Sequence, residues 1–547
     1  MSKVDVDLRD LLAKVLPTDV KVTIRHLSST PTASVALFAP SPGEEPEPTF
    51  CENHFLSTSI TPADKDDAEI IVFGVEVLVY TTTHLTTIFV SKADSTGHLH
   101  LLKAAPKGSL LRRISSTFLS FLVDTHQRPA VRLVVSLFAR SQSQYLFPGS
   151  IENPEKHVLD DRGLIKWWCR SIDPILREYE PESDSHEKGL EESAQSSATA
   201  YLIVPGCDKF ETRGFFPNTA KTDHKDRPRW LNSYPLHQLC SNPSAPPRCL
   251  VPRLPDDPKT RFLLDLDDEL PGSSMDSAGE NAGQWRSVKS LDQFWEMMSF
   301  RQECSAGRLV GFLWLVVNPP GIVNSNPMQT SRSVSTEVKE PRKTDATTSN
   351  EPTQVSASPS IELPATSDEL PKQQQPSEIP KDPKVDPSSQ PKDPTRVQPT
   401  TAGTAFYWPQ AGRGHAVLSE EDYKVAINFL LRQDFFNEEV SFASTKAFNE
   451  KVASLADQLW VGQQVTGKST DGEFTGSMQA PNTVVPTLLV RKRKKNEGES
   501  EQTTLTTTTT DKDPITPTES TKSAAESSQA SGVNVLQANL IRKKKKT

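Results

Sequence analysis

Two adjacent aspartates, Asp256 and Asp257, stand in the stretch RLPDDPKTRF, closely followed by Lys259 and Arg261. Adjacent carboxylates repel each other, so the pKa of one of them can rise toward neutrality, and such a group can accept a proton from a substrate. The same letters also fit an Asx-type turn, because Asp-Pro pairs commonly begin turns. Taken alone, the stretch leaves both interpretations open.

Three more clusters combine aromatic with charged residues, namely VSKADSTG at 90–97, FARSQSQYLFPGS at 138–150 and KHVLDDRGLIKWW at 156–168. Trp167 and Trp168 cannot both face the same side of a helix, so at least one of them is expected at a groove or a ligand. Common catalytic motifs are missing, because the sequence has no Walker loop, no GxGxxG after a strand, no GxSxG and no HExxH. Its eleven histidines do not pair at metal-ligand spacing, so no metal site is predicted.

Composition limits how much of the 547-residue chain can fold. Only 35% of the residues are hydrophobic, 44 are proline, and no aromatic residue occurs between Leu315 and Ala405. We therefore expect a main body over 1–320, a disordered proline-rich linker over 321–402, a helical segment over 403–468 and a disordered tail over 469–547. The helical segment is expected to dock back on the main body, because alone it could not bury its apolar face.

Hydrophobic periodicity predicts both helices and strands in the main body. Helices are expected over 8–16, 108–123, 161–179 (interrupted near Pro174) and 291–304, and strands over 70–83, 85–94, 200–206 and 309–317, while 130–138 fits either. After the linker, one helix is expected from Ser419 and another over 445–460. Helices and strands without regular alternation predict an α+β fold, with a central mixed sheet surrounded by helices and no βαβ repeat.

The ends of the chain and its cysteines predict a soluble intracellular protein. The N-terminus has acids where a secretory signal would be apolar, and the longest apolar run, at 309–317, is too short to span a bilayer. Six scattered cysteines form no CxxC pair. The net charge is −9, but basic runs at 490–496 and 541–547 favour nuclear import or contact with a polyanion over a merely solvated tail.

Taken in order, these clusters resemble the KAT11 family of fungal histone H3 lysine acetyltransferases, whose fold is similar to that of the CBP-type enzymes. The matching motifs are SKAD, SQYLFP, KHVL, LIKWW, PDDPKTRF, FW followed by RQE, and a terminal basic run, over residues 5–317 and 403–468. The resemblance implies transfer of acetyl from acetyl-CoA to the αN-helix core lysine and N-terminal tail lysines of newly synthesised histone H3. It also implies roles in replication-coupled nucleosome assembly and the DNA damage response.

The resemblance implies particular partners as well. They are histone H3 with H4, a NAP-family chaperone and an anti-silencing-function chaperone, in the nucleus, with no membrane and at most weak DNA binding through the basic tail. A non-catalytic scaffold that binds histones or chaperones is the alternative. A scaffold would have no reason to keep a complete set of catalytic residues, and the sequence has all of Asp94, Trp167, Trp168, Asp257 and Lys259.

The same resemblance assigns a site for acetyl-CoA. Its residues are Ala93, Asp94, Ser95, Gly108, Ser109, Leu110, Leu111, Arg112, Phe138, Gln142, His157, Val158, Leu159 and Trp167. Residues 108–112 would hold the pyrophosphate, since glycine allows close approach, helix N-terminal amides favour anions and Arg112 adds charge. An ordinary helix start would explain the same letters, and the family often has a smaller residue than Gln142.

For catalysis, the resemblance makes Asp257 the proton acceptor, supported by Asp256 and Asp94. A substrate lysine has a pKa of ~10.4 and must lose a proton before it can attack a thioester. The resemblance places Trp168 and Tyr145 at the lysine tunnel, although Tyr145 alone would be interpreted as an ordinary buried tyrosine. The family acetylates its own lysine at the position of Lys259, and losing that charge is expected to let the segment bury.

Overall fold

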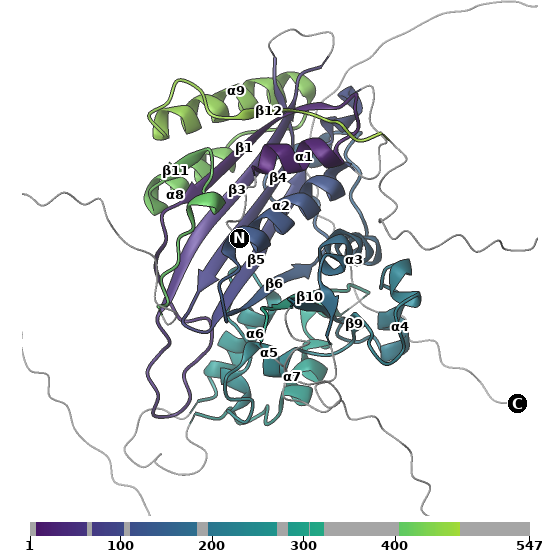
Figure 1. The fold of residues 1–547 in the computed structure, drawn as a ribbon, viewed down its shortest axis with the longest axis vertical. Helices are drawn as coiled ribbons and strands as arrows, with labels where there is room; N and C mark the ends of the chain where they lie inside the picture. Colours follow the sequence, from purple (N-terminus) through teal and green to yellow (C-terminus); the bar gives the residue numbers. More distant parts are fainter. Residues whose placement is uncertain are drawn as a thin grey trace, which may run out of the picture. The chain divides into compact units, whose positions relative to one another are not determined.

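The computed structural model describes residues 7–62, 68–102, 110–182, 195–270, 283–305, 307–321 and 404–470. A mixed sheet runs through these residues, with helices on both of its faces (Figure 1). Its twelve strands in the described part are β1 Lys21–Ser29, β2 Thr32–Ser34, β3 Thr49–Ile60, β4 Ile70–Thr81, β5 Leu85–Ser95, β6 Arg132–Ala139, β7 Glu180–Pro181, β8 Ser197–Ile203, β9 Trp230–Leu231, β10 Gly311–Asn318, β11 Ala416–Leu418 and β12 Gln463–Thr466.

The helices of the described part fall into three groups along the chain. They are α1 Leu8–Val15, α2 Leu110–His126 and α3 Asp161–Arg177; then α4 Lys209–Arg213, α5 Leu236–Leu239, α6 Pro258–Asp267 and α7 Leu291–Met298; and finally α8 Glu420–Leu430 and α9 Glu438–Leu455. Short 3₁₀ turns lie at η1 His98–Leu101, η2 Ser150–Glu152, η3 Asn218–Lys221, η4 Pro247–Cys249, η5 Gln302–Cys304 and η6 Gln410–Gly412. No helix among the described residues is long and apolar enough to cross a membrane.

The sheet has the order β11-β1-β3-β4-β5-β6-β10-β8-β7. Most neighbours are antiparallel, including the β4–β5 hairpin expected near His84, but β5 and β6 are parallel and α2 connects them. The β8–β9 pair is also parallel, with α4 between its strands, so βαβ crossovers occur inside this mixed sheet without a regular repeat. The α+β prediction is therefore confirmed, and the ambiguous segment 130–138 is the strand β6.

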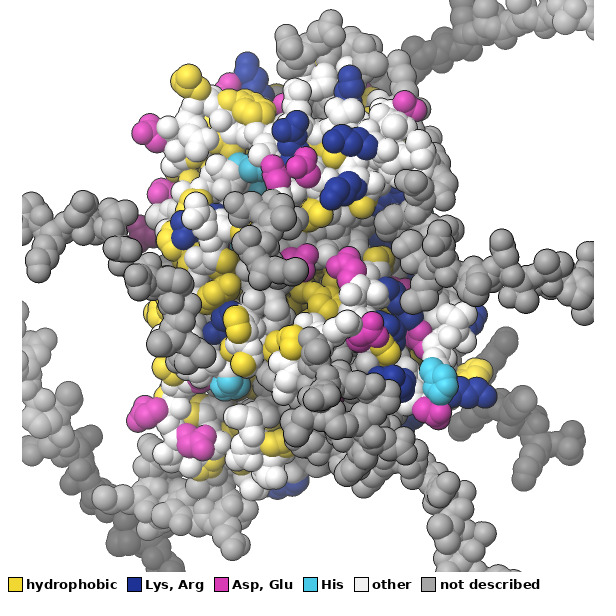
Figure 2. Space-filling model, in the orientation of Figure 1, with side chains coloured by type: hydrophobic (Ala, Val, Ile, Leu, Met, Phe, Trp, Pro, Cys, Tyr) yellow, Lys and Arg dark blue, Asp and Glu magenta, His cyan; other side chains and the backbone are white. Residues whose placement is uncertain are grey.

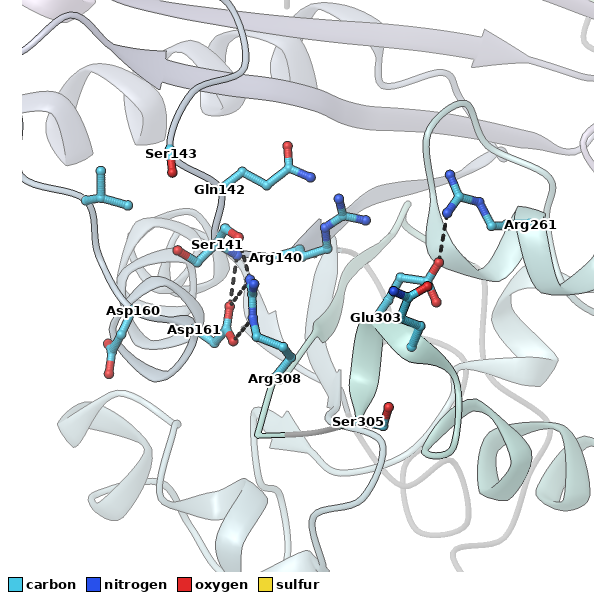
Figure 3. Close-up of a pocket in the computed structure, with 12 residues that line it drawn as sticks. Arg140, Ser141, Gln142, Ser143, Asp160, Asp161, Arg261, Glu303, Ser305 and Arg308 are labelled. Atoms are coloured by element: carbon cyan, nitrogen blue, oxygen red, sulfur yellow. Dashed lines mark hydrogen bonds and ion pairs between the residues drawn. The ribbon is translucent and has the colours of Figure 1, made fainter. Parts of the chain in front are cut away.

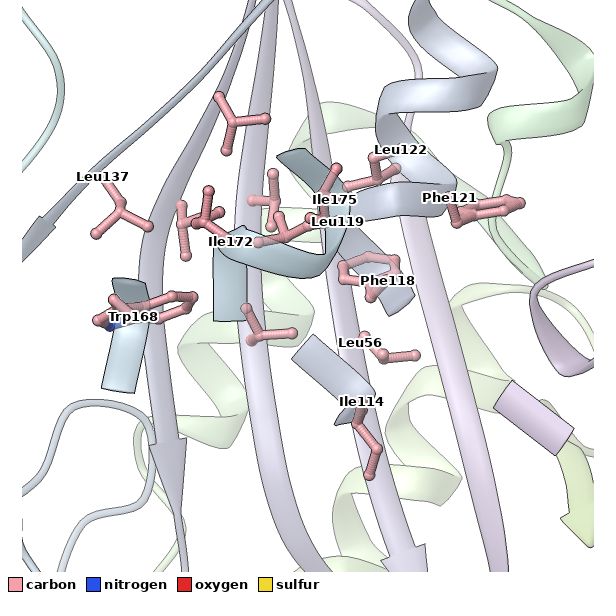
Figure 4. Close-up of a cluster of buried hydrophobic side chains, with 14 of the residues drawn as sticks. Leu56, Ile114, Phe118, Leu119, Phe121, Leu122, Leu137, Trp168, Ile172 and Ile175 are labelled. Carbon is pink, nitrogen blue, oxygen red and sulfur yellow. The ribbon is translucent and has the colours of Figure 1, made fainter. Parts of the chain in front are cut away.

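The two long helices α2 and α3 lie side by side on one face of the sheet. Phe118 and Leu122 of α2 and Ile172 of α3 are fully buried in the largest hydrophobic cluster (Figure 4). Phe118 and Leu122 are four residues apart and therefore lie on the same side of α2. This helical spacing of apolar residues is the pattern from which the sequence predicted the helix. Asp160 caps the start of α3 by accepting the N–H of Gly163, and the candidate site lies at that end of the helix.

The predictions for three helices were wrong in part. Helix α3 continues through Pro174, because its apolar side is buried in the core and that packing outweighs one lost backbone hydrogen bond. Helix α9 begins at Glu438, well before the expected start at 445, because Asn437 caps it. Helix α7 ends at Met298 instead of continuing to 304.

The segment 404–470 packs against the part of the fold that precedes the linker. Strand β11 pairs with β1 in parallel, and β12 pairs with β1 antiparallel. Helices α8 and α9 and the loop between them bury apolar residues against the sheet face opposite α2, among them Tyr423, Leu430, Phe435, Phe448 and Val452. The predicted disordered linker and tail lie outside the described residues except at their margins, where Ser469 donates its N–H to Leu16 O (2.9 Å).

His98 links η1 to α9, and it makes the stability of the fold depend on pH. Its Nε2 lies 2.9 Å from Ser441 Oγ, and burial together with the neighbouring His100 lowers the pKa of His98 to about 4. An unfolded histidine has a pKa of about 6.5, so between pH 6.5 and 4 the unfolded chain holds more protons than the folded one. The free energy of unfolding should therefore fall as the pH is lowered through this window, by up to about 1.4 kcal/mol per pH unit from this group.

Denaturant titrations at pH 7, 6 and 5 test this expectation. His98→Gln should flatten the decline relative to the unchanged chain. The control His84→Gln alters an exposed histidine on the far end of the β4–β5 hairpin and should leave the slope unchanged. If the free energy of unfolding falls equally with pH in all three proteins, His98 is not the cause of the decline.

Candidate active site

A cavity of about 500 Å³ lies where the end of β5, the loop after β6 and the start of α3 come together. Most of the residues expected to hold a cofactor or a substrate lysine line it. They are Ala93, Asp94, Ser95, Leu111, Phe138, Gln142, Tyr145, His157, Val158, Leu159, Trp167 and Trp168. Four separate sequence segments thus contribute to one cavity.

The two tryptophans form one wall of this cavity. Their ring centroids are 4.8 Å apart and the rings are perpendicular. Trp168 is buried in the core beside Leu137 and Ile172 (Figure 4), whereas Trp167 is half-buried, and both line the cavity. The buried ring of Trp168 therefore supports the half-buried ring of Trp167.

Asp94 organises the cavity through its own hydrogen bonds. Its Oδ2 accepts from the N–H groups of Tyr145 (2.7 Å) and Leu146 (3.0 Å), and its Oδ1 pairs with Lys156 Nζ (2.8 Å). A side chain at Gly97 would collide with the backbone of Lys156, so glycine permits the approach that brings this lysine to Asp94. The carboxylate is 7% exposed, and it holds β5, the 145–147 turn and the 150s loop together.

Tyr145 projects its ring into the cavity from the turn that Asp94 holds. Its hydroxyl donates to Arg140 O (2.8 Å), and burial raises the pKa of Tyr145 to about 12, so the phenol is neutral at physiological pH. The satisfied hydroxyl is the one expected of an ordinary buried tyrosine, and the same side chain also lines the cavity.

Two further hollows adjoin this cavity, because Arg140 and Gln142 line all three. One of about 470 Å³ contains Asp256 and Asp257. The other, of about 830 Å³, is shown in Figure 3 and is framed by Asp161, Arg308 and Glu303. A continuous concave surface thus connects the tryptophan wall with the two adjacent aspartates.

An ion pair anchors the loop that separates the hollows. Arg308 Nε donates to Asp161 Oδ2 (2.8 Å), and its Nη2 donates to Ser141 O (2.6 Å) (Figure 3). Partial burial of Asp161 acts to raise its pKa, but hydrogen bonds from Arg308, Leu309 and Ser141 lower it below its usual value. The clamp fixes residues 140–142 against the start of α3, where the hollows meet.

Asp257 is the N-cap of α6, and it is buried together with Lys259. Its Oδ1 accepts from Lys259 N (2.8 Å), its Oδ2 pairs with Lys259 Nζ, and both side chains are 1% exposed. The Lys259 ammonium also lies 4.2 Å from the ring centre of Phe312. Burial lowers the pKa of Lys259 below its usual value although Asp257 opposes this effect.

Asp256 faces the opposite way. Its φ of 56° is in the left-handed region, which aspartate tolerates better than most residues, and its carboxylate is 67% exposed. Lys92 Nζ lies 3.3 Å from Asp256 Oδ2 and 2.9 Å from Glu76 Oε2, and Tyr423 OH of α8 reaches Glu76 at 3.4 Å. A chain of polar contacts therefore runs from the acidic turn to the segment after the linker.

These contacts correct two expectations. Asp256 and Asp257 do not form a like-charge pair, because the turn points them apart and each carboxylate has a lysine of its own. Acetylation is not needed to bury the segment, because Lys259 is already buried as an amine beside Asp257. The interpretation of the stretch as an Asx-type turn is also correct, since Asp257 caps α6 and Pro258 is its first residue.

The residues expected to hold the pyrophosphate are only partly in place. Gly108 and Ser109 lie outside the described residues, Leu110 is buried in the core and Leu111 lines the cavity. Arg112 does not line it but lies near Arg170 and Arg113, and burial together with these like charges lowers its pKa. Figure 2 shows Lys and Arg side chains over α1 and α2, with Asp and Glu side chains among them.

Sequence reasoning did not single out Lys92, Lys156 or Arg140. All three lie inside the motifs SKAD, KHVL and FARSQ, so a signal was present. Their roles depend on partners that are distant in the sequence, Glu76 and Asp94 in particular. Only the fold brings these partners together.

Comparisons with known proteins agree with the geometry. A family model described as histone acetyltransferase KAT11-type domain matches residues 8–132 and 128–451. Histone acetyltransferase rtt109 from Aspergillus flavus is 67% identical over 567 residues and covers 100% of both chains, and rtt109 from Schizosaccharomyces pombe is 30% identical over 56% of this chain and 70% of its own. The crystal structure of Rtt109 from Aspergillus fumigatus is similar with a TM-score of 0.68 and 65% identity, covering 85% of this chain and 99% of that chain.

Proposed function

Because this chain belongs to the KAT11-type histone acetyltransferase family, it is an acetyltransferase with acetyl-CoA as co-substrate, and we propose that it acetylates newly synthesised histone H3. The proposed targets are the αN-helix core lysine and lysines of the N-terminal tail. One observation supports the catalytic interpretation above all, namely that residues of the family motifs SKAD, SQYLFP, KHVL and LIKWW line a single cavity next to the two adjacent aspartates.

The residues of the cavity fit the chemistry of acetyl-CoA. Phe138, Val158, Leu159 and Trp167 offer an apolar wall for the pantetheine arm. The cations Arg112, Arg113 and Arg170 repel one another, and an anion such as a CoA phosphate would relieve this repulsion. Acetyl-CoA supplies the activated acyl group, and these side chains orient it.

The proposed path for the substrate lysine passes Trp168 and Tyr145. Both give an apolar wall, which favours the neutral amine over the ammonium ion. The amine nitrogen attacks the thioester carbonyl, the C–S bond breaks and CoA leaves as its thiolate, and the proton from nitrogen goes to a carboxylate in the adjoining hollow. We assign this proton acceptor to Asp257, with Asp256 and Lys92 shaping the charge around it.

Whether Asp257 can accept a proton depends on the charge of Lys259. While it is an ammonium ion, it occupies Asp257 Oδ2 and neutralises its charge. Acetylation of Lys259 would remove the charge while leaving an N–H that can still donate, so Asp257 would be freer to accept a proton. The lowered pKa of Lys259 favours the neutral amine that such self-acetylation requires. Mass spectrometry of the protein before and after incubation with acetyl-CoA tests the modification.

The decisive experiment for the function is transfer of labelled acetyl from acetyl-CoA to H3–H4. It should be run with no chaperone, with a NAP-family chaperone and with an anti-silencing-function chaperone, and the modified lysines mapped by mass spectrometry. We expect H3 to be labelled and chaperones to increase the rate. Label on H4 alone, or on no histone under any condition, would contradict the proposal and favour the scaffold alternative.

Trp167→Ala should weaken acetyl-CoA binding roughly tenfold or more, because a lost aromatic wall removes about 1.4 kcal/mol or more of contact. Isothermal titration of acetyl-CoA measures the change. Trp460→Ala is the matched control, since that tryptophan is 51% exposed and does not line the cavity. Unaltered affinity in Trp167→Ala would show that this wall does not hold the cofactor.

A chain ending at residue 486 should keep its acetyl-CoA affinity and lose nuclear accumulation, chaperone stimulation or both. The deleted part contains the two basic runs, which are the proposed import signals and contacts to acidic partners. Microscopy of a tagged chain and the chaperone assay measure the two effects. Full nuclear accumulation together with full stimulation would leave the basic runs without either role.

A further inference from the structure

A second cluster of chemically capable side chains is buried between the sheet and α2. Among the described residues, Glu52 and His54 of β3 and His126 of α2 each offer a ligand atom within 4.8 Å of the others. Glu52 is 2% exposed, and both histidines are 0% exposed. None of the three lines any of the three hollows described above.

The outer nitrogens of both histidines have hydrogen-bond partners. His126 Nδ1 lies 3.0 Å from Leu122 O, which can only accept, so this nitrogen carries the hydrogen in the neutral ring and Nε2 carries a lone pair. His54 Nδ1 lies 3.0 Å from His26 Nε2, so it too is held from outside the cluster. This is the arrangement in which metal-binding histidines are oriented, with one nitrogen fixed and the other free to bind.

The inner nitrogens face the carboxylate at distances that are long for hydrogen bonds, and the contact of His126 with Glu52 is a weak one. His54 Nε2 and Glu52 Oε1 are 3.4 Å apart, and neither atom has a hydrogen-bond partner in the described structure. His126 Nε2 lies 3.4 Å from Glu52 Oε2, longer than a normal N–H···O bond. A lone pair opposite a carboxylate oxygen is repulsive unless a positive charge lies between them.

The spacing fits a cation between the three groups. Zinc binds imidazole nitrogen and carboxylate oxygen at about 2.0–2.1 Å, so two ligand atoms on a tetrahedron around it are about 3.3 Å apart. Each histidine Nε2 lies 3.4 Å from one of the two Glu52 oxygens, His54 from Oε1 and His126 from Oε2, and one ligand atom of each residue lies within 4.8 Å of the others. Two imidazoles with one carboxylate are ligands that suit zinc better than calcium or magnesium, which prefer oxygen alone.

We propose that Glu52, His54 and His126 form a structural zinc site that ties α2 to β3. The segment after the linker covers this site. A Cβ atom at Gly412 would lie 2.6 Å from His126 Cε1, and His415 Nδ1 accepts the N–H of His26 (3.2 Å). A bound ion would therefore also make the surface on which residues 410–415 pack more rigid. No spacing signal in the sequence points to this site, because the ligands come from two elements far apart in the chain.

The test measures metal binding by the untagged full chain after treatment with a chelator and dialysis against zinc. We expect one zinc per chain by mass spectrometry of the released metal. Glu52→Gln and His126→Gln keep most of the side-chain volume and should weaken binding about 100-fold or more. The matched control is His84→Gln, an exposed histidine beside Glu47, which should bind zinc as the unchanged chain does. No stoichiometric zinc, or unchanged affinity in both ligand variants, would overturn the proposal.

A second measurement needs no substitution and therefore does not depend on the variants folding. X-ray absorption of the zinc-loaded chain should show nitrogen and oxygen neighbours at about 2.0–2.1 Å, with the multiple scattering of imidazole and no sulfur near 2.3 Å. Sulfur neighbours would place the metal on one of the six free cysteines and overturn the assignment. Hydrogen exchange of residues 404–418 should also slow when zinc is added back, and equal exchange would exclude the coupling to that segment.

Discussion

Replacing Asp257 with asparagine should lower acetyl transfer about 100-fold or more while leaving acetyl-CoA affinity almost unchanged. The reason is that asparagine keeps the cap of α6 and the side-chain volume but cannot accept a proton. Steady-state transfer to H3–H4 and titration of acetyl-CoA measure the two quantities. The same substitution leaves Lys259 buried without its counter-charge, which should cost about 3–5 kcal/mol of unfolding free energy.

Two companion variants separate catalysis from stability. Lys259→Met removes the buried cation, and Asp257→Asn combined with Lys259→Met should regain the stability that the single asparagine variant loses. Transfer by the double variant should nevertheless stay far below transfer by Lys259→Met alone. If transfer recovers together with stability, Asp257 is a structural cap and the proton acceptor must be another group.

Removing the segment after the linker should prevent folding altogether. A chain ending at residue 403 loses side chains such as Tyr423, Leu430, Phe435, Phe448 and Val452 from the core, and each contributes roughly 1.5–3 kcal/mol. Their sum is comparable to the whole stability of a typical domain, about 5–15 kcal/mol. Circular dichroism and thermal melting should show no cooperative transition in the shortened chain.

The matched control ends at residue 478, beyond β12, and should melt as the full chain does. Phe448→Ala gives a graded version of the same test, with an expected loss of about 3–5 kcal/mol. A cooperative melt in the chain ending at 403 would show that the main body folds alone, and that the packing seen on β1 is optional.

The sequence predicted those elements whose cause is local. Helices α1 and α2 and the β4–β5 hairpin were found because their apolar spacing or turn lies within a few residues. The continuation of α3 through Pro174 could not be found, since it depends on burial that only the assembled core supplies. Pairing of β11 and β12 with β1 spans most of the chain, and no local pattern encodes it.

The candidate site shows the same division. Residues that lie within motifs, such as Trp167 and Tyr145, were found and do line the cavity. The directions of the two aspartate side chains were not predicted. The positive φ of Asp256 turns its side chain outward and leaves Asp257 as the buried cap of α6. A carboxylate's partner cannot be read from a stretch of letters, and here Lys156, Lys92 and Lys259 decide what each acid can do.

Strand β1 has a consequence for the synthesis of this protein. It is made among the first thirty residues and pairs with β3 along one edge, but the partners of its other edge, β11 and β12, are made only with residues 416–466. Protein synthesis adds about 5–20 residues per second, so the backbone groups on this edge of β1 have no final partner for roughly 20–90 s. An open strand edge is a template for pairing with other chains. During translation the newly made protein therefore passes through a period of aggregation risk that ends only when its last strand arrives.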